Sequence, residues 1–190
     1  MTSAPPKARG PGAPTPARSH APPRRVPGPL SPERPRRLLM TADTVGGVWT
    51  YALDLAAGLA AHGVTTRLVT MGRPMLAHQR REARHVPGLR VVETAYKLEG
   101  MSDPWADVDA AGELLMALDA ELRPDVVHLN GFAHASLSWR APTVVVGHSC
   151  VETWWRAVKG APTDDAWRTY RDRVRRGIAD AAAFVAPTGA

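Results

Sequence analysis

The sequence predicts an α/β fold built on a doubly wound parallel sheet. Short apolar segments of strand length alternate along the chain with segments that have the apolar spacing of a helix or the length of a helical connection. The strand segments are apolar throughout, which is typical of strands that are buried on both faces. Several of them end in glycine or in a small polar residue, so the ligand-binding groups are expected at one edge of the sheet.

The first unit of the fold is predicted at residues 36–62, as a strand, a glycine turn and a helix. The turn contains Gly46 and Gly47, and one helix face carries Val48, Ala52, Leu55 and Leu59. A helix that begins at such a turn directs free N–H groups and the positive end of its dipole toward the end of the strand, where they stabilise an anion. The alternative hypothesis is that the glycine pair only makes a tight turn.

The remaining elements follow from the same patterns. A helix is predicted from Pro104 to the residue before Pro124, with Asp103 as its N-cap. Residues 73–88 are polar and Arg-rich and contain only hints of a short helix. The other expected elements are strands at residues 64–72, 89–94, 125–129, 143–149 and 183–188 and a last helix at 163–182.

Residues 1–36 are predicted to form a disordered tail in front of the domain at residues 37–190. Residues 1–37 contain eleven of the eighteen prolines and eight of the 24 basic residues but only one of the 18 acidic residues. This stretch therefore carries a charge of +7, against −1 for the rest of the chain. A segment with almost no large apolar residues cannot offset its ordering entropy. Its basic clusters suggest at most a weak contact with an anionic membrane surface, and we predict no nucleic-acid partner.

Several functional classes are not supported by the sequence. There is no run of eighteen apolar residues and no apolar core of a signal peptide, so we expect a soluble, cytoplasmic protein. The glycine turn lacks the G-x-G-x-x-G spacing of dinucleotide-binding proteins, and no P-loop lysine follows it. The histidines lack metal-binding spacing, and Cys150 is the only cysteine. We therefore predict no metal and no cofactor.

The candidate ligand-binding residues are the polar residues that follow the predicted strands. They are Gly46, Gly47, Asn130, Gly131, His148, Ser149 and Thr188. His148 is the main candidate, because an imidazole at the end of a buried strand can hydrogen-bond a sugar or a phosphate. Cys150 is interpreted as a small packed thiol. Trp154 and Trp155 could either grip a sugar or nucleotide ring or pack against a neighbouring domain.

These segments together resemble the N-terminal domain of family 4 glycosyltransferases, which have the GT-B fold. The resemblance is carried by residues 38–72, 124–131, 144–149 and 184–188, in this order. It implies two Rossmann-like domains that face each other across a cleft, of which this chain is the N-terminal, acceptor-side one. It also implies that Gly46 and Gly47 lie near the donor phosphates, that His148 lies beside the transferred sugar, and that Asn130 and Gly131 border the acceptor.

The resemblance implies transfer of a sugar, with retention, from a nucleoside diphosphate sugar to a hydroxyl acceptor. The chain ends where the family's C-terminal domain would begin, so the basic residues and the E-x7-E motif of that domain are not in this sequence. Glu113 and Glu121 have that spacing, but they lie on the predicted helix before residue 124. Two alternatives remain: a non-catalytic fragment or subunit that binds a separately encoded C-terminal half, and a GT-B sugar-nucleotide epimerase.

Overall fold

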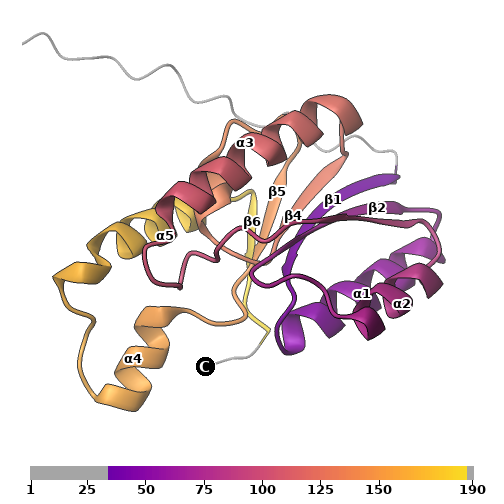
Figure 1. Ribbon diagram of the computed structural model, residues 1–190. Coiled ribbons are helices and arrows are strands. Elements are labelled where there is room, and N and C mark those ends of the chain that lie inside the picture. Colours follow the sequence, from indigo (N-terminus) through magenta and orange to yellow (C-terminus); the bar gives the residue numbers. More distant parts are fainter. Residues whose placement is uncertain (1–33, 188–190) are drawn as a thin grey trace, which may run out of the picture.

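The computed structural model of the chain describes residues 34–187 (Figure 1). The elements are β1 (Arg37–Asp43), α1 (Gly47–Ala60), β2 (Thr65–Met71), α2 (Ala77–His85), β3 (Leu89–Glu93), α3 (Trp105–Leu122), β4 (Val126–Leu129), η1 (Ala133–Ser136), β5 (Thr143–Val146), α4 (Val151–Lys159), η2 (Asp165–Trp167), α5 (Arg168–Asp180) and β6 (Ala183–Val185). The predicted disordered tail falls almost entirely outside the described residues, as does Thr188.

The six strands form one sheet in the order β3-β2-β1-β4-β5-β6, and all five strand pairs are parallel. This confirms the predicted α/β fold with a Rossmann-like, doubly wound parallel sheet. The strand order reverses between β1 and β4, which are neighbours in the sheet although they are far apart in sequence. In such a sheet the loops after these two strands diverge and leave a crevice at the carboxyl edge.

Helices cover both faces of the sheet. Successive residues of a strand point to opposite faces, so one strand contributes side chains to two cores. In β1, Leu39 belongs to the core under α3, η1 and α5, whereas Leu38 and Met40 belong to the core under α1 and α2. Figure 1 shows α1 and α2 on one side of the sheet and α3 and α5 on the other. Leu39 and Met40 are fully buried, and each such side chain stabilises the fold by about 1.5–3 kcal/mol.

Two helices differ from their sequence-based predictions. Helix α3 begins at Trp105 with Pro104 as its N-cap, so the assignment of Asp103 as N-cap is wrong. Asp103 instead has a left-handed backbone with φ of 46°. The Lys97 ammonium donates to the carbonyl oxygens of Ser102 and Asp103, at 3.2 and 3.1 Å, which holds this turn in place.

The predicted last helix is divided into the short η2 and α5. The side chain of Asp164 accepts a hydrogen bond from the N–H of Ala166 at 3.0 Å and caps η2, so the chain turns before α5 begins. Tyr170 and Val174 of α5 are buried, whereas Ile178, one turn further on, is exposed. Within residues 34–187, no helix combines the length and apolar character that a membrane span requires.

Candidate functional site

The turn after β1 leads into α1 through a glycine pair and leaves the start of the helix without a side-chain cap. The Asp43 carboxylate accepts a hydrogen bond from the Val45 N–H at 2.7 Å, which bends the chain away from the strand. Gly46 then has φ of +68°, a backbone conformation that residues with a side chain rarely adopt. A Cβ added at Gly46 or Gly47 would meet no atom within 4 Å. No side chain caps α1, and its first turn contains no acidic residue.

Asn130 and His148 meet at the same edge of the sheet. Asn130 follows β4, His148 lies two residues after β5, and these two strands are neighbours. Nε2 of His148 lies 2.8 Å from Oδ1 of Asn130. The other end of the amide is bound to β1, because Nδ2 of Asn130 donates to the Thr41 carbonyl oxygen at 2.7 Å. The loop after β4 is therefore connected to β1 on one side and to the end of β5 on the other.

Helix α1 brings Tyr51 against both histidines of this region. The ring of Tyr51 packs edge-on against the ring of His148, with 4.7 Å between the ring centroids. Its hydroxyl lies 3.3 Å from Nε2 of His128, a buried residue of β4. Tyr51 is one turn from Gly47, so this contact places the start of α1 beside His148. The glycine turn, Asn130 and His148 thus share one rim of a single parallel sheet.

Burial sets the protonation of the titratable groups at this rim. It lowers the pKa of His148 below the usual histidine value, and the nearby charge of Asp43 only partly opposes this effect. Burial also lowers the pKa of His128 and raises the pKa of Asp43. His148 is therefore neutral near pH 7, and a neutral imidazole can both donate and accept a hydrogen bond.

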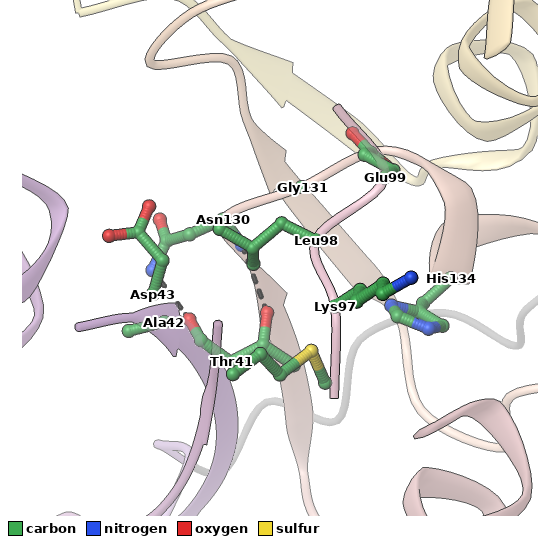
Figure 2. Close-up of a pocket in the computed structure, with 10 residues that line it drawn as sticks. Thr41, Ala42, Asp43, Lys97, Leu98, Glu99, Asn130, Gly131 and His134 are labelled. Carbon is green, nitrogen blue, oxygen red and sulfur yellow. Dashed lines mark hydrogen bonds between the residues drawn. The ribbon is translucent and has the colours of Figure 1, made fainter. Parts of the chain in front are cut away.

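A small pocket opens between the ends of β1 and β4, at the point where the strand order reverses (Figure 2). Its polar lining comes from Thr41, Asp43, Lys97, Glu99, Asn130 and His134. The loop between β3 and α3 supplies Lys97 and Glu99 and thereby crosses the carboxyl edge of the sheet. Gly131 lies against the Glu99 carboxylate, since a Cβ added there would be 3.7 Å from Oε1.

Glu99 fixes the backbone that follows Gly131. Its carboxylate accepts hydrogen bonds from the N–H groups of Phe132, at 3.0 and 3.2 Å, and Ala133, at 2.6 Å. Burial raises the pKa of Glu99, while the two N–H donors act in the opposite direction. The donors stabilise the carboxylate form. Glu99 therefore holds the loop that carries Asn130 and Gly131.

The remaining sequence-based candidates lie next to this rim or at its border. Ser149 follows His148 directly and is exposed. Cys150 is partly buried, and its sulfur accepts a hydrogen bond from the Tyr170 hydroxyl at 3.6 Å. Trp155 packs on Trp167, with ring centroids 6.0 Å apart, whereas Trp154 is 53% exposed. In the described part of the chain, no cluster of three or more His, Cys, Asp or Glu side chains could hold a metal ion.

Sequence reasoning did not identify Asp43, Tyr51 or Glu99 as site residues. Asp43 had a usable signal, because it is the last residue of β1 and directly precedes the glycine turn. Tyr51 sits between the apolar positions of α1 and looks like an ordinary helix residue. Glu99 lies in a loop without a motif, and only the folded chain shows that this loop reaches Phe132.

Two solved structures match the chain over most of its length. One is the crystal structure of LpCGTa in complex with UDP, with a TM-score of 0.51, 15% identity, and coverage of 80% of this chain and 46% of that chain. The other is Phytolacca americana UGT2 complexed with UDP-2fluoro-glucose and pterostilbene, with a TM-score of 0.57, 10% identity, and coverage of 82% and 48%. At these identities the likeness concerns the fold.

The chain spans less than half the length of these two proteins. No curated protein sequence matches it. The family model for Glycosyltransferase Family 4 matches residues 45–190, which is most of the chain and includes the glycine turn, Asn130 and His148. With this match and the GT-B-like architecture, the chain belongs to glycosyltransferase family 4.

Proposed function

We propose that this chain is the acceptor-side half of a retaining glycosyltransferase that moves a sugar from a nucleoside diphosphate sugar to a hydroxyl acceptor. One observation carries the proposal: the open start of α1 and the imidazole of His148 lie at the same rim, joined through Tyr51. An anion-binding backbone and a neutral hydrogen-bonding ring are what a donor with a phosphate beside a sugar requires. Asn130, Gly131 and Ser149 would border the acceptor.

The glycine turn would bind the donor phosphates. The N–H groups at the start of α1 have no side-chain cap, and the space around Gly46 and Gly47 is open to a ligand. A helix N-terminus favours an anion by about 0.3–1 kcal/mol at an exposed site and by up to about 2 kcal/mol where the site is partly buried. Closing the site with a second domain would strengthen this interaction, since water would be excluded.

His148 would hydrogen-bond a hydroxyl group of the transferred sugar. A neutral ring suits this task, because it need not lose or gain a charge when the sugar binds. No general base is assigned to the acceptor, and by family resemblance the departing phosphate would itself assist the deprotonation of the acceptor. The residues that would neutralise that phosphate belong to the C-terminal half.

Turnover is proposed to need a C-terminal domain, in the same polypeptide or separately encoded. The chain covers 46% and 48% of the two matched proteins, which supports this view. With one domain alone, the cleft has one wall and the charges of the transition state stay exposed to water. A cytoplasmic location, where nucleotide sugars would be accessible, is part of the proposal.

The test compares the chain alone with the chain joined to a family 4 C-terminal domain. Donor binding is measured by calorimetry with a panel of UDP-, ADP-, GDP- and dTDP-sugars, and transfer is followed by release of the nucleoside diphosphate with hydroxyl acceptors. We expect turnover only in the joined protein. We also expect the substitution His148→Ala to lower this turnover about 100-fold, the scale seen when one hydrogen-bonding group of a catalytic site is removed.

The control is His62→Ala, which removes an exposed histidine just beyond the far end of α1 and should leave turnover unchanged. Equal losses in the two variants would contradict the role of His148. Turnover by the chain alone would contradict the need for a second half. Product analysis identifies the epimerase alternative, since an altered sugar nucleotide without transfer would replace the proposed reaction.

A further inference from the structure

The amide of Asn130 is oriented by its bonds to β1. A backbone carbonyl oxygen can only accept a hydrogen bond, so the group that lies 2.7 Å from the Thr41 carbonyl must be the amide nitrogen Nδ2. The backbone N–H of Asn130 also donates to the Thr41 hydroxyl at 3.2 Å. These two bonds leave only Oδ1 to face His148. The side chain of Asn130 therefore presents an acceptor to the imidazole.

This orientation determines which nitrogen of His148 carries hydrogen. Oδ1 of Asn130 cannot donate, so Nε2 of His148, at 2.8 Å, must be the donor. In a neutral imidazole the other nitrogen, Nδ1, then has no hydrogen and can only accept. Among residues 34–187 no side chain or backbone group hydrogen-bonds Nδ1 of His148. The ring thus offers one unused acceptor at the rim of the sheet.

The groups around the ring are consistent with its neutral form. Tyr51 packs edge-on against it from α1, and the Tyr51 hydroxyl lies 3.3 Å from Nε2 of His128 of β4. Burial lowers the pKa of His128, a hydrogen bond with Asn130 raises it, and a charge on His148 would lower it further, so the two rings are not charged together. Within residues 34–187, Asp43 at the end of β1 is the carboxylate whose charge acts on His148, and burial disfavours the charged form of that carboxylate as well. The hydrogen bond to Asn130 satisfies Nε2 without adding a negative charge that would hold the ring protonated.

We propose that Asn130 is a positioning residue, which holds His148 as the neutral tautomer with hydrogen on Nε2, so that Nδ1 accepts a hydrogen bond from a hydroxyl group of the ligand. This gives Asn130 a role inside the protein, in addition to its place at the border of the acceptor that the family resemblance implies. The statement about the tautomer rests on the geometry alone. The statement that the ligand hydroxyl belongs to a sugar rests on the proposed function.

The direct test is the NMR spectrum of the ring nitrogens in the ¹⁵N-labelled chain, with His148 assigned through the variant His148→Gln. Two-bond couplings between the ring protons and nitrogens identify the protonated nitrogen. We expect hydrogen on Nε2 and none on Nδ1 throughout pH 7–8. Hydrogen on Nδ1 in the unmodified chain would overturn the proposal.

Two substitutions of Asn130 test its part in this arrangement. Asn130→Leu removes the acceptor at similar volume, and we expect a mixture of the two tautomers. Asn130→Asp keeps an acceptor but adds a negative charge, and we expect the pKa of His148, measured by NMR titration, to rise by about one unit or more. An unchanged ring spectrum and pKa in the two variants would overturn the proposal. If Asn130→Leu does not fold, Asn130→Asp carries the test.

Thr41→Val is the matched control. It removes the hydroxyl that accepts the Asn130 N–H but keeps the carbonyl that holds Nδ2. We expect a lower melting temperature and an unchanged tautomer of His148, which separates positioning of the ring from general stability. A changed tautomer in this variant would mean that the backbone of the loop, and not the Asn130 side chain, orients the ring.

The pH dependence of sugar transfer in the joined protein connects the tautomer to function. In Asn130→Asp, the acidic limb of the rate profile should move to higher pH by the same amount as the pKa of His148 measured by NMR. The ring spectra need neither donor nor acceptor. If the spectra agree with the proposal but the joined protein transfers no sugar, the proposed function fails and the tautomer assignment stands. If sugar is transferred at a normal rate but the spectra show hydrogen on Nδ1, the tautomer assignment fails and the proposed function stands.

Discussion

Gly177 shows how the size of one residue sets the position of a helix. It lies on the buried face of α5, where a Cβ built on its backbone would collide with the carbonyl oxygen of Phe132. Phe132 directly precedes η1, so backbone faces backbone and no side chain can move aside. We predict that Gly177→Ala destabilises the protein by about 1–3 kcal/mol, the usual cost of overpacking. Urea unfolding followed by circular dichroism measures this loss.

Gly58 provides the matched comparison, because it is also a helical glycine but a Cβ there meets open space. We predict that Gly58→Ala stabilises the protein by about 0.5–1 kcal/mol, since alanine loses less backbone freedom than glycine in a helix. If the two substitutions have equal effects, the close approach of α5 to Phe132 is not what Gly177 provides.

Because His128 is buried, we predict that it makes the folded protein less stable in mild acid. Burial lowers its pKa in the folded state, so at pH values between the folded and the unfolded pKa the unfolded chain binds more protons. The contribution of this residue is fully present above about pH 6.5, the unfolded value, and is lost as the pH falls toward the folded pKa. We predict that His128→Asn loses less stability than the unmodified protein between pH 7.5 and 5.5.

The measurement is the difference between the two urea midpoints at each pH, because other groups titrate in the same range. Asp43 and Glu99 act in the opposite direction: burial raises their pKa values, so the folded state takes up protons more readily than the unfolded chain on acidification. Both proteins contain Asp43 and Glu99, so the effect of these two residues on stability cancels in the difference. An equal loss in both proteins would contradict a neutral, buried His128.

At the level of single residues, the sequence predicted which polar residues meet at the candidate site, because these residues follow strands. Gly46, Asn130 and His148 could be found because the carboxyl ends of parallel strands meet at one edge. The partners of these residues could not be predicted in this way. Tyr51 reaches His148 through the packing of α1 on the sheet, and Glu99 reaches Phe132 through an irregular loop. Neither contact leaves a periodic pattern in the sequence.

Helices α1 and α4 each carry tryptophan, but only α1 uses it to hold the element on the sheet. Trp49 of α1 is 5% exposed and its Nε1 donates to Glu82 of α2 at 2.9 Å, whereas Trp154 of α4 is 53% exposed. We predict that Trp49→Ala costs about 3–5 kcal/mol of unfolding free energy. Trp154→Ala should cost about 0.5 kcal/mol or less, because its ring removes little surface from water.

Chemical denaturation of both variants under the same conditions measures the two losses. A large loss in Trp154→Ala would mean that α4 packs against the body of the domain, contrary to the absence of buried residues among Val151–Lys159. Figure 1 shows α4 extending away from the sheet. The open alternatives for the tryptophan pair, stacking on a ligand or packing beneath a second domain, both require such an exposed ring.

Elements with a clear apolar face were predicted from the sequence, and those fixed by polar contacts were not. Helix α2 lies within residues 73–88, where only hints of a helix were seen, and its sole buried residues are Gln79 and Ala83. Gln79 donates to the Thr44 carbonyl at 2.9 Å and is part of the hydrogen bonding that docks the helix. A buried polar anchor of this kind has no periodic signature, so apolar spacing could not reveal it.

At the scale of the whole molecule, the alternation of strands and helices predicted the parallel arrangement of the sheet. The strand order, and with it the reversal between β1 and β4, comes from the structure. The sequence also predicted that the candidate residues Asn130 and His148 would lie at one edge of the sheet, and the structure places them there. The sequence did not predict how much of the sheet stays exposed. Residues of β6 are all exposed, and Phe184 and Val185 keep 45% of their surface accessible although the sequence reads as a buried strand.

This exposed edge leads to a prediction about self-association. Among the described strands, β6 pairs only with β5, so its other side offers free backbone groups beside apolar side chains. Such an edge templates pairing with another chain, and a charged residue on it opposes that pairing. We predict that Val185→Lys lowers concentration-dependent light scattering of the chain and changes its unfolding free energy by about 0.5 kcal/mol or less.

The control is Val158→Lys on α4, because it makes the same change in charge and residue type at a residue that is 57% exposed but belongs to a helix. If charge alone keeps the chains apart, both substitutions lower the scattering equally and the edge of β6 has no special part. A clearly greater effect of Val185→Lys means that the edge is where chains pair. If the proposed C-terminal domain covers β6, joining it should then lower the scattering of the unmodified chain, and this result would place the second domain next to this strand.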